Sequence, residues 1–248
     1  RIGRIHDATQ AETAVKGAQD AGIDNINLDL MYALPQQTLA GALVDVEKAL
    51  LLQTPHLSHY QLTLEPNTAF AANPPPLPDD DHAWTMQEAC EARLAAAGYG
   101  QYEISAYAQP GRRCVHNLNY WQFGDYLGIG AGAHGKLSDT ASGAVYRRWK
   151  TRHPRAYMEA PGGTTRVGGD SVVSAAELPF EYMLNALRLV DGVPMAAFAE
   201  RTGLPAERIA AALANARRRG WLHDDPRMLH TTALGQRFLN DVIASFLD

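Results

Sequence analysis

Cysteine is scarce in this sequence, and its scarcity excludes two classes of protein. The 248 residues include only Cys90 and Cys114. Two cysteines are too few for the disulfide framework of a small secreted domain. They are also too few to ligate an iron–sulfur cluster, which takes about three or four thiolates. The chain therefore cannot hold such a cluster with its own cysteines alone.

Long apolar runs and an excess of positive charge are also absent. No apolar run approaches the roughly 20 residues that span a bilayer, and the start, RIGRIHDATQ, lacks the apolar core of a secretory signal. We expect a cytoplasmic protein, with peripheral attachment to a membrane as a further expectation. The net charge of −5 and the pI near 6.0 exclude a general attraction to nucleic acid.

The first half of the chain contains a regular alternation of helical and extended segments. Helical spacing of apolar residues predicts helices over residues 9–21, 38–53 and 81–97, and alternating polarity predicts strands over residues 25–32, 56–64 and 100–106. Helices longer than about ten residues between strands are typical of parallel βαβ units. The sequence therefore predicts an α/β fold with a parallel sheet.

A second region is expected beyond a loose connection. The stretch 137–169 is rich in Gly, Thr, Ser and Arg and is predicted to be irregular, apart from one strand over residues 144–149. Helices are predicted over residues 176–189, 194–201, 205–219 and 232–247, with a two-stranded wing before the last one. This order resembles a winged-helix module. We therefore expect two domains, residues 1–165 and 170–248.

Asp29 is a candidate binding residue at the end of the first predicted strand. It lies on the face opposite three aliphatic side chains, and chemistry in α/β folds gathers at the carboxyl ends of strands. A carboxylate there can accept hydrogen bonds from a ribose or an amine. The alternative is a solvated or capping aspartate.

The motif HNLNYW places an imidazole, a phenol and an indole close together, at His116, Tyr120 and Trp121. Imidazole binds haem iron readily, and phenolate is a further haem ligand. The neighbouring Arg112 and Arg113 can pair with carboxylates such as haem propionates. The alternative is a loop histidine bonded to the backbone, with the two aromatic residues as core anchors.

The motif GIGAGAH leaves the backbone bare at Gly128, Gly130 and Gly132, just before His134. Glycine permits positive φ and close backbone approach, so a nucleotide or adenosine can rest on such a segment. The spacing is not that of the dinucleotide-binding GxGxxG motif.

Arginines at positions 208, 217, 218 and 219 put positive charge on or at the end of the helix that would read DNA in a winged helix. They indicate phosphate contacts in one interpretation and ordinary cations at a helix C-terminus in the other. Because the chain is acidic overall, we expect no nucleic-acid partner.

Six motifs occur in a characteristic order along the chain: GRIH, NLDLMYALPQQT, YQLTLEPNT, YEISAYAQPG, HNLNYW and GDYLGIGAGAH. Together they resemble the radical S-adenosylmethionine (SAM) family of oxygen-independent coproporphyrinogen III oxidases, and most of all its HemW-type haem-chaperone branch. The resemblance implies the C-terminal part of an incomplete (β/α) barrel of the radical SAM type, followed by a small helical, winged-helix-like HemN-type domain.

The resemblance also implies site residues. Arg4 in GRIH and Asp29 in NLDLMY match positions that bind SAM in that family. The segment from Gly128 through Gly130 and Gly132 to His134 resembles a wall of the same pocket. His116 matches the position proposed to contact haem, and therefore its iron, with Tyr120 and Trp121 beside it.

In the complete family member a CxxxCxxC motif holds a [4Fe–4S] cluster, with SAM on its open iron. This sequence contains no CxxxCxxC and begins with Arg rather than Met. Two interpretations stay open: the C-terminal portion of a longer chain, or a degenerate homologue.

The function implied by the resemblance is that of a haem chaperone, which binds haem and passes it to haem-accepting proteins such as membrane respiratory enzymes. The first alternative is an enzyme, a radical SAM coproporphyrinogen III oxidase of porphyrin biosynthesis. The second is a winged-helix nucleic-acid-binding module. The missing cluster cysteines leave the question of enzymatic activity open.

Overall fold

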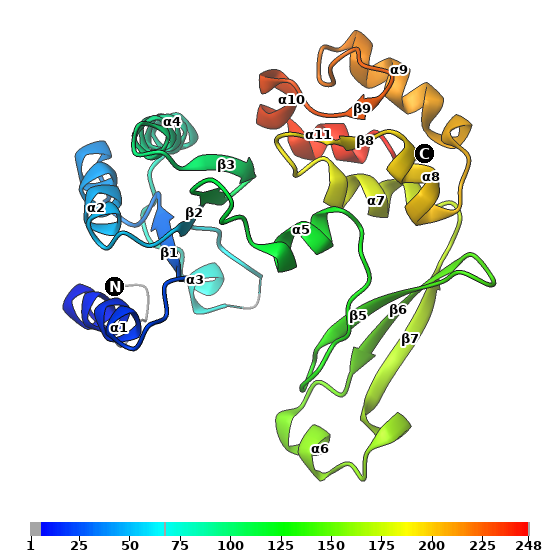
Figure 1. Ribbon diagram of the computed structural model, residues 1–248, viewed down its shortest axis with the longest axis horizontal. Helices are drawn as coiled ribbons and strands as arrows, with labels where there is room; N and C mark the ends of the chain where they lie inside the picture. The colour runs from blue at the N-terminus through cyan, green and yellow to red at the C-terminus, as the bar shows by residue number, and fades with distance from the viewer. Residues whose placement is uncertain (1–5, 67, 248) are drawn as a thin grey trace. The chain divides into compact units, whose positions relative to one another are not determined.

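The computed structural model describes residues 6–66 and 68–247, and the chain divides into two compact units between Cys114 and Val115 (Figure 1). This division differs from the predicted domain limits, 1–165 and 170–248, which stay a prediction about the domains of the chain. The segment after Val115 belongs with the C-terminal helices because its side chains pack on them. The ring of Phe123 lies 5.6 Å from that of Tyr182, centroid to centroid.

The first unit contains a four-stranded sheet with the strand order β1-β2-β4-β3. Its strands are β1 (Asn27–Tyr32), β2 (His56–Gln61), β3 (Gly100–Glu103) and β4 (Ala106–Ala108). β1 and β2 are parallel, as predicted, but β4 runs antiparallel to both of its neighbours.

The predicted single strand over residues 100–106 is therefore wrong. A tight turn at Ile104 and Ser105 divides it into the β3–β4 hairpin. The carboxylate of Glu103 stabilises this turn, because its Oε1 accepts hydrogen bonds from the backbone N–H (3.0 Å) and the hydroxyl (2.9 Å) of Ser105. β4 takes the place next to β2 that a continuous parallel strand would have occupied.

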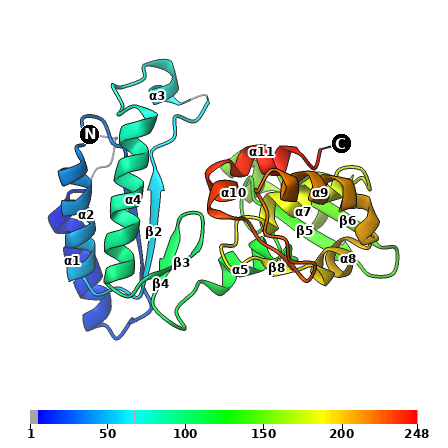
Figure 2. The same ribbon diagram turned by 90° about the horizontal axis from the view of Figure 1, so that it is seen from above.

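Two long helices cover one face of this sheet (Figure 2). The helices of the unit are α1 (Ala8–Asp20), α2 (Leu39–Leu51), α3 (Ala69–Ala72) and α4 (Asp80–Ala96). The hydroxyl of Thr38 caps α2, and the carboxylate of Asp79 caps α4. Val46 of α2 and Met86 of α4 belong to the same buried core as Leu57 of β2. The opposite face of the sheet is left for polar side chains.

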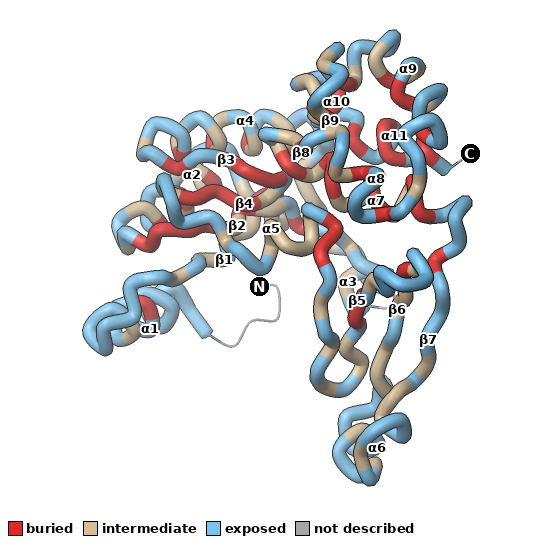
Figure 3. Tube along the Cα trace, turned by 45° about the vertical axis from the view of Figure 1, so that its right-hand side comes forward, coloured by how far each residue is buried: buried red, intermediate tan, exposed pale blue. Residues whose placement is uncertain are grey.

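The second unit contains a three-stranded antiparallel sheet in which β6 is central. Its strands are β5 (His134–Asp139), β6 (Ala144–Lys150) and β7 (Val167–Val173). The strand predicted over residues 144–149 is confirmed, but the prediction that the rest of this stretch is irregular is wrong. Gly168 and Gly169 in β7 gave no local strand signal, since glycine is depleted in strands. Most residues of this sheet are exposed or half-buried (Figure 3).

The rest of the second unit is mainly helical. Its helices are α5 (Val115–Trp121), α6 (Pro154–Glu159), α7 (Leu178–Ala186), α8 (Ala196–Thr202), α9 (Ala210–Arg218), α10 (Ala233–Arg237) and α11 (Leu239–Ala244), with 3₁₀ turns η1 (Gly163–Arg166) and η2 (Ala206–Ile209). The predicted last helix is divided at Phe238, whose φ and ψ of −111° and 34° are not helical.

A short two-stranded sheet accompanies these helices, and only one of its strands comes from the predicted wing, residues 221–229. β8 (Val193–Pro194) pairs with β9 (Met228–Leu229), and Leu222 forms a bridge with Thr231. Among the described residues, no helix combines the length and apolarity needed to cross a membrane.

Candidate functional site

The HNLNYW motif forms most of α5, the first helix of the second unit. His116 is exposed, and its ring meets the ring of Tyr120, one helical turn later, edge to face at 4.7 Å and 86°. Tyr120 in turn lies 4.2 Å from Tyr126, centroid to centroid. The three rings form one aromatic row with the imidazole at its exposed end.

The imidazole of His116 is available to a ligand. Within the described residues, no hydrogen bond engages either of its ring nitrogens. Its neighbour Val115 is 80% exposed, and Leu127, which follows Tyr126, is 74% exposed. Exposed apolar residues therefore adjoin both ends of the aromatic row in the sequence.

Trp121 has a different role from its motif neighbour. Its indole is half-buried, and the guanidinium of Arg188 on the segment after α7 lies over it, 4.4 Å from the ring centroid. A cation over an indole face stabilises packing. Trp121 thus anchors α5 to the helical part of the unit.

The three glycines of GIGAGAH and Gly135, which follows the motif, fall into two pairs with different surroundings. A Cβ at Gly128 would lie 2.4 Å from the backbone oxygen of His134, and one at Gly135 would lie 3.0 Å from the nitrogen of Gly128. These two glycines allow the chain to close upon itself. In contrast, Gly130 and Gly132 have φ angles of 111° and 70°, and a Cβ at Gly130 would meet nothing within 4 Å. Only the second pair leaves backbone open to a ligand.

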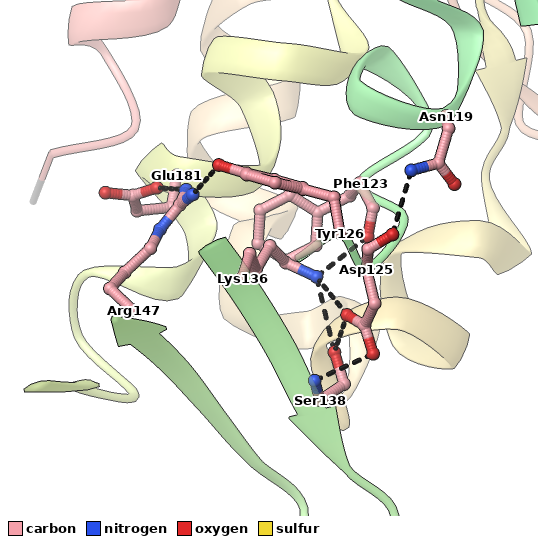
Figure 4. A network of polar contacts seen from close by, with 8 residues as sticks. All are labelled: Asn119, Phe123, Asp125, Tyr126, Lys136, Ser138, Arg147 and Glu181. Carbon is pink, nitrogen blue, oxygen red and sulfur yellow. Dashed lines mark hydrogen bonds and ion pairs between the residues drawn. The ribbon is translucent and has the colours of Figure 1, made fainter. Parts of the chain in front are cut away.

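A buried lysine, which sequence reasoning did not identify, holds this loop in place. Lys136 of β5 is only 2% exposed. Its ammonium donates to the backbone oxygen of Phe123 (3.0 Å), to Asp125 (2.9 Å) and to Ser138 (3.3 Å), as Figure 4 shows. It also lies 4.1 Å from the centroid of the Phe123 ring. A lysine in an alternating strand reads as a surface residue, so only its three-dimensional partners identify it.

Burial lowers the pKa of Lys136, and its bond to Asp125 opposes that effect. Burial also acts to raise the pKa of Asp125, but hydrogen bonds from Lys136 and Ser138 outweigh it and hold the pKa below its usual value. Each partner of this 2.9 Å ion pair therefore favours the charged form of the other. Nearby, Arg147 donates to the hydroxyl of Tyr126 (2.9 Å) and pairs with Glu181 of α7 (Figure 4). These contacts fix the position of Tyr126, the last ring of the aromatic row.

In the first unit, Asp29 ends a chain of hydrogen bonds on the open face of the sheet. The amide of Asn27 donates to Asp29 (2.9 Å) and accepts from Nδ1 of His56 (2.6 Å). Nε2 of His56 accepts from the hydroxyl of Tyr102 (2.8 Å), which itself accepts from the backbone N–H of Cys114 (3.4 Å). Because the Asn27 oxygen can only accept, the proton of His56 is on Nδ1. Every donor then points toward the Asp29 carboxylate.

The environment of this chain favours a neutral imidazole. Burial lowers the pKa of His56, while Glu103 and Asp29 act to raise it. Asp29 is exposed and lines a hollow of about 530 Å³ together with His6, Asp7, Asp45 and Tyr60. Apolar side chains line the rest of this hollow, among them Leu30, Met31 and Leu34, so the predicted SAM-binding aspartate lies in a mixed polar and apolar hollow.

Among the described residues, no other predicted SAM-binding position lies in the same unit as Asp29. Arg4 lies outside the described residues. Gly128, Gly130, Gly132 and the exposed His134 belong to the second unit, whereas Asp29 belongs to the first. Their common pocket stays a prediction.

The residues present do not fit an iron–sulfur cluster. Cys90 is buried in the core of the first unit, where burial raises its pKa to about 11, and Cys114 is half-buried. In the part of the chain that the structure describes, no group of three His, Cys, Asp or Glu side chains could hold a metal ion.

The arginine cluster has structural partners. Arg217 donates to the backbone oxygen of Asp225 (2.8 Å), and the guanidinium of Arg219 lies 4.7 Å from the centroid of the Trp221 ring. These contacts tie α9 to the wing. They give no support to the alternative of a nucleic-acid-binding helix.

Comparison with known proteins identifies relatives along the whole chain. Residues 173–238 match the family described as HemN C-terminal domain. The chain is 46% identical over 247 residues to the protein named Heme chaperone HemW of Escherichia coli (strain K12), and covers 64% of it. It is 44% identical to the protein of the same name in Haemophilus influenzae, covering 63% of it. All of this chain is covered in both cases.

A solved structure shares the fold. It is described as coproporphyrinogen III oxidase (HemN) from Escherichia coli, a radical SAM enzyme, and matches with a TM-score of 0.76 at 17% identity. The match covers 98% of this chain and 59% of that one. The predicted fold class, α/β of the radical SAM type with a HemN-type C-terminal domain, is confirmed. The chain spans just under two thirds of the length of its HemW relatives. Along its whole length, the chain is therefore similar to proteins that carry the name haem chaperone HemW.

Proposed function

We propose that this chain is the haem-binding part of a haem chaperone, with His116 as the ligand of the haem iron. The observation that carries the proposal is the exposed imidazole of His116 at the end of the aromatic row with Tyr120 and Tyr126. Its relatives of 46% and 44% identity carry the name haem chaperone.

The surroundings of His116 suit a flat, apolar ligand. Haem presents an apolar plate, an iron that accepts imidazole nitrogen, and two carboxylates. Val115 and Leu127 supply exposed apolar side chains to such a plate. Edge-to-face contact with Tyr120 restricts the rotation of the imidazole, so binding costs less side-chain entropy.

Haem, when bound, would be cargo that is handed to an acceptor protein, and exposure of His116 suits such a transfer. A fully enclosed ligand would have to be released by opening the protein. Acceptors such as membrane respiratory enzymes, and a cytoplasmic or peripheral membrane location, belong to this proposal. A [4Fe–4S] cluster and SAM would be supplied by a complete chain, since the described residues do not fit the cluster.

Haem titration of the 248-residue chain tests the ligand. We expect a shift of the Soret band with the wild type and loss of that shift, with at least about tenfold weaker binding, in His116→Ala. His82→Ala removes an exposed histidine from the first unit and serves as the control. Tyr120→Phe keeps the aromatic contact but removes the phenol. An unchanged Soret shift in His116→Ala would sink the proposal, and a loss confined to Tyr120→Phe would move the ligand to the phenolate.

A further inference from the structure

The first unit contains an apolar groove that haem binding at His116 does not use. It measures about 540 Å³ and lies between the start of α2, the proline-rich segment before α4, and the first turns of α4. Its apolar lining consists of Leu39, Pro76, Leu77, Pro78 and Met86. The volume is within the usual range of ligand pockets, roughly 300–1,000 Å³, so the groove can receive side chains of a partner.

The topology of the sheet brings the segments of this groove together. The helix α2 connects the parallel strands β1 and β2, and α4 leads from β2 to β3. Both helices therefore begin at the same end of the sheet. Met86 belongs to the buried core of the unit, whereas Leu39 is 38% exposed. The apolar lining thus extends from the core to the surface.

The backbone around the groove is held rigidly. Pro76 and Pro78 have a fixed φ because of their rings. Gln36, another lining residue, has a φ of 62°, which is uncommon outside glycine. Its neighbour Gln37 fixes this turn, because its side-chain oxygen accepts from the N–H of Leu34 (3.1 Å) and its amide donates to Asp45 (2.9 Å). A preformed groove binds a partner at a low cost in conformational entropy.

The charge around the groove is negative. Its described lining includes Asp79 but no Lys or Arg, and Asp80 and Asp81 follow in the first turn of α4. Asp81 lies one helical turn before the lining residue Thr85, so it shares that face of the helix. Asp79 pairs with His82 at 2.6 Å. Asp80 and Asp81 are exposed, and in the described part of the chain neither forms an ion pair.

This charge decides which kind of ligand the groove suits. Acidic residues outnumber Lys and Arg over the whole first unit, residues 1–114, so its field repels anionic ligands. An apolar side chain with Lys or Arg beside it suits both the lining and the acidic turn. A segment of a protein chain combines these groups.

We propose that this groove docks a segment of a partner protein in which an apolar side chain is flanked by Lys or Arg. The apolar side chain packs against Leu39 and Leu77, and the cations pair with Asp80 and Asp81. Docking requires no haem, so it is independent of iron coordination by His116. That the partner is a haem-accepting protein rests on the proposed function.

Selection of peptides by the 248-residue chain tests the groove. The probe is a phage-displayed library of random peptides of about 12 residues, long enough to span such a groove. We expect the enriched peptides to contain an apolar residue next to Lys or Arg. Fluorescence anisotropy with a labelled synthetic copy of the most enriched peptide then gives the affinity.

Two variants should weaken this peptide binding. The double variant Asp80→Asn, Asp81→Asn should weaken it by about threefold to tenfold, because exposed ion pairs contribute modestly. About 0.5 M salt should weaken binding to the wild type as well, since it screens these pairs. Thr85→Arg should weaken binding by at least about tenfold, because its long cationic side chain occupies the groove and repels the cations of the peptide.

The double variant Glu12→Gln, Asp20→Asn is the matched control. It removes the same charge from exposed positions of α1, outside the groove, and its affinity should equal that of the wild type. Circular dichroism melting of every variant checks that the fold is intact. Thr85 and the four acidic positions are exposed, so loss of folding is not expected.

Several outcomes would overturn the proposal. They are the absence of any enriched peptide, enrichment of acidic peptides, and wild-type affinity in Thr85→Arg. Enrichment of a sequence that occurs in this chain would assign the groove to a second copy and would also overturn it. His116→Ala should bind the peptide as the wild type does, and Thr85→Arg should keep the Soret shift with haem. Failure of one proposal is therefore distinguishable from failure of the other.

Discussion

At the scale of single residues, the most consequential side chain outside the motifs is Lys136. Its ammonium is buried and neutralised by Asp125, which is 41% exposed at its side chain. Removing one partner of such a pair costs stability mainly because the other groups lose their bonds. The aromatic row beside His116 depends on this pair, since Lys136 also binds the backbone of Phe123.

We therefore expect Lys136→Met to lower the free energy of unfolding by about 2–3 kcal/mol, a value reduced by the partial exposure of Asp125. Urea denaturation measures it. Lys16→Met on the exposed face of α1 is the control and should change stability by less than about 0.5 kcal/mol. A Lys136→Met variant as stable as the wild type would show that the pair contributes nothing net.

His59 gives the first unit a pH-dependent stability. Its ring is 3% exposed, stacks on Tyr32 at 4.7 Å, and its Nδ1 has no hydrogen-bond partner among the described residues. Burial lowers the pKa of His59 from 6.5 to about 4. Below about pH 6.5 His59 therefore binds a proton in the unfolded state but not in the folded state. The free energy of unfolding falls as the pH falls.

We expect the free energy of unfolding to drop by about 2 kcal/mol between about pH 7 and pH 5 through this residue. His59→Phe keeps a ring against Tyr32 but cannot titrate, so its pH dependence in that range should be shallower. His82→Ala, at an exposed histidine, should leave the slope unchanged. Equal slopes for His59→Phe and the wild type, in denaturation series at several pH values, would contradict the prediction.

At the scale of elements, the GIGAGAH loop brings two chain segments into contact at its base and leaves its backbone open at its tip. Gly128 and Gly135 bring the chain segments before and after the loop into contact, as the bridge between Tyr126 and Lys136 requires. Gly130 and Gly132 adopt positive φ, which side chains rarely adopt. Residues 128–135 therefore contain one pair of glycines for folding and another at the open tip of the loop.

Gly128→Ala should destabilise the second unit by about 2 kcal/mol or more, because the added Cβ meets the backbone oxygen of His134. Gly17→Ala is the contrasting variant: it lies within α1 with nothing within 4 Å of the added carbon. That change should stabilise the chain by about 0.5–1 kcal/mol. Thermal melting compares the two, and a neutral Gly128→Ala would show that the loop can open.

The elements also mark where prediction from sequence succeeds. Helices α1, α2 and α4 and strands β1, β2 and β6 follow from apolar periodicity and capping residues such as Thr38. The β3–β4 hairpin could not be predicted, because its turn at Ile104 and Ser105 lacks the glycine or asparagine that usually marks a tight turn. A carboxylate from Glu103 performs that task instead.

At the scale of the whole molecule, each unit buries an apolar core of its own. Val46, Met86 and Leu57 belong to the core of the first unit. Tyr182 joins Phe123 and Phe198 in the second, at 5.6 and 5.3 Å between ring centroids. Units with separate cores commonly unfold in separate steps.

We expect differential scanning calorimetry to resolve two transitions in this chain. His59→Phe at acidic pH should shift only the transition of the first unit, and Lys136→Met only that of the second. The variants assign each transition to its unit without cutting the chain. A single transition that both variants shift equally would show that the two units unfold as one.

The sequence by itself determined the family resemblance, the α/β class and the candidate residues Asp29 and His116. Apolar periodicity and short motifs can be read directly from the order of the residues. Only the tertiary structure decided which of those residues are accessible and what holds them. The burial of Lys136 and the hydrogen bonds that lead from Tyr102 through His56 to Asn27 depend on contacts between separate segments of the chain. Such contacts leave no local pattern, since any strand that pairs in register can supply them.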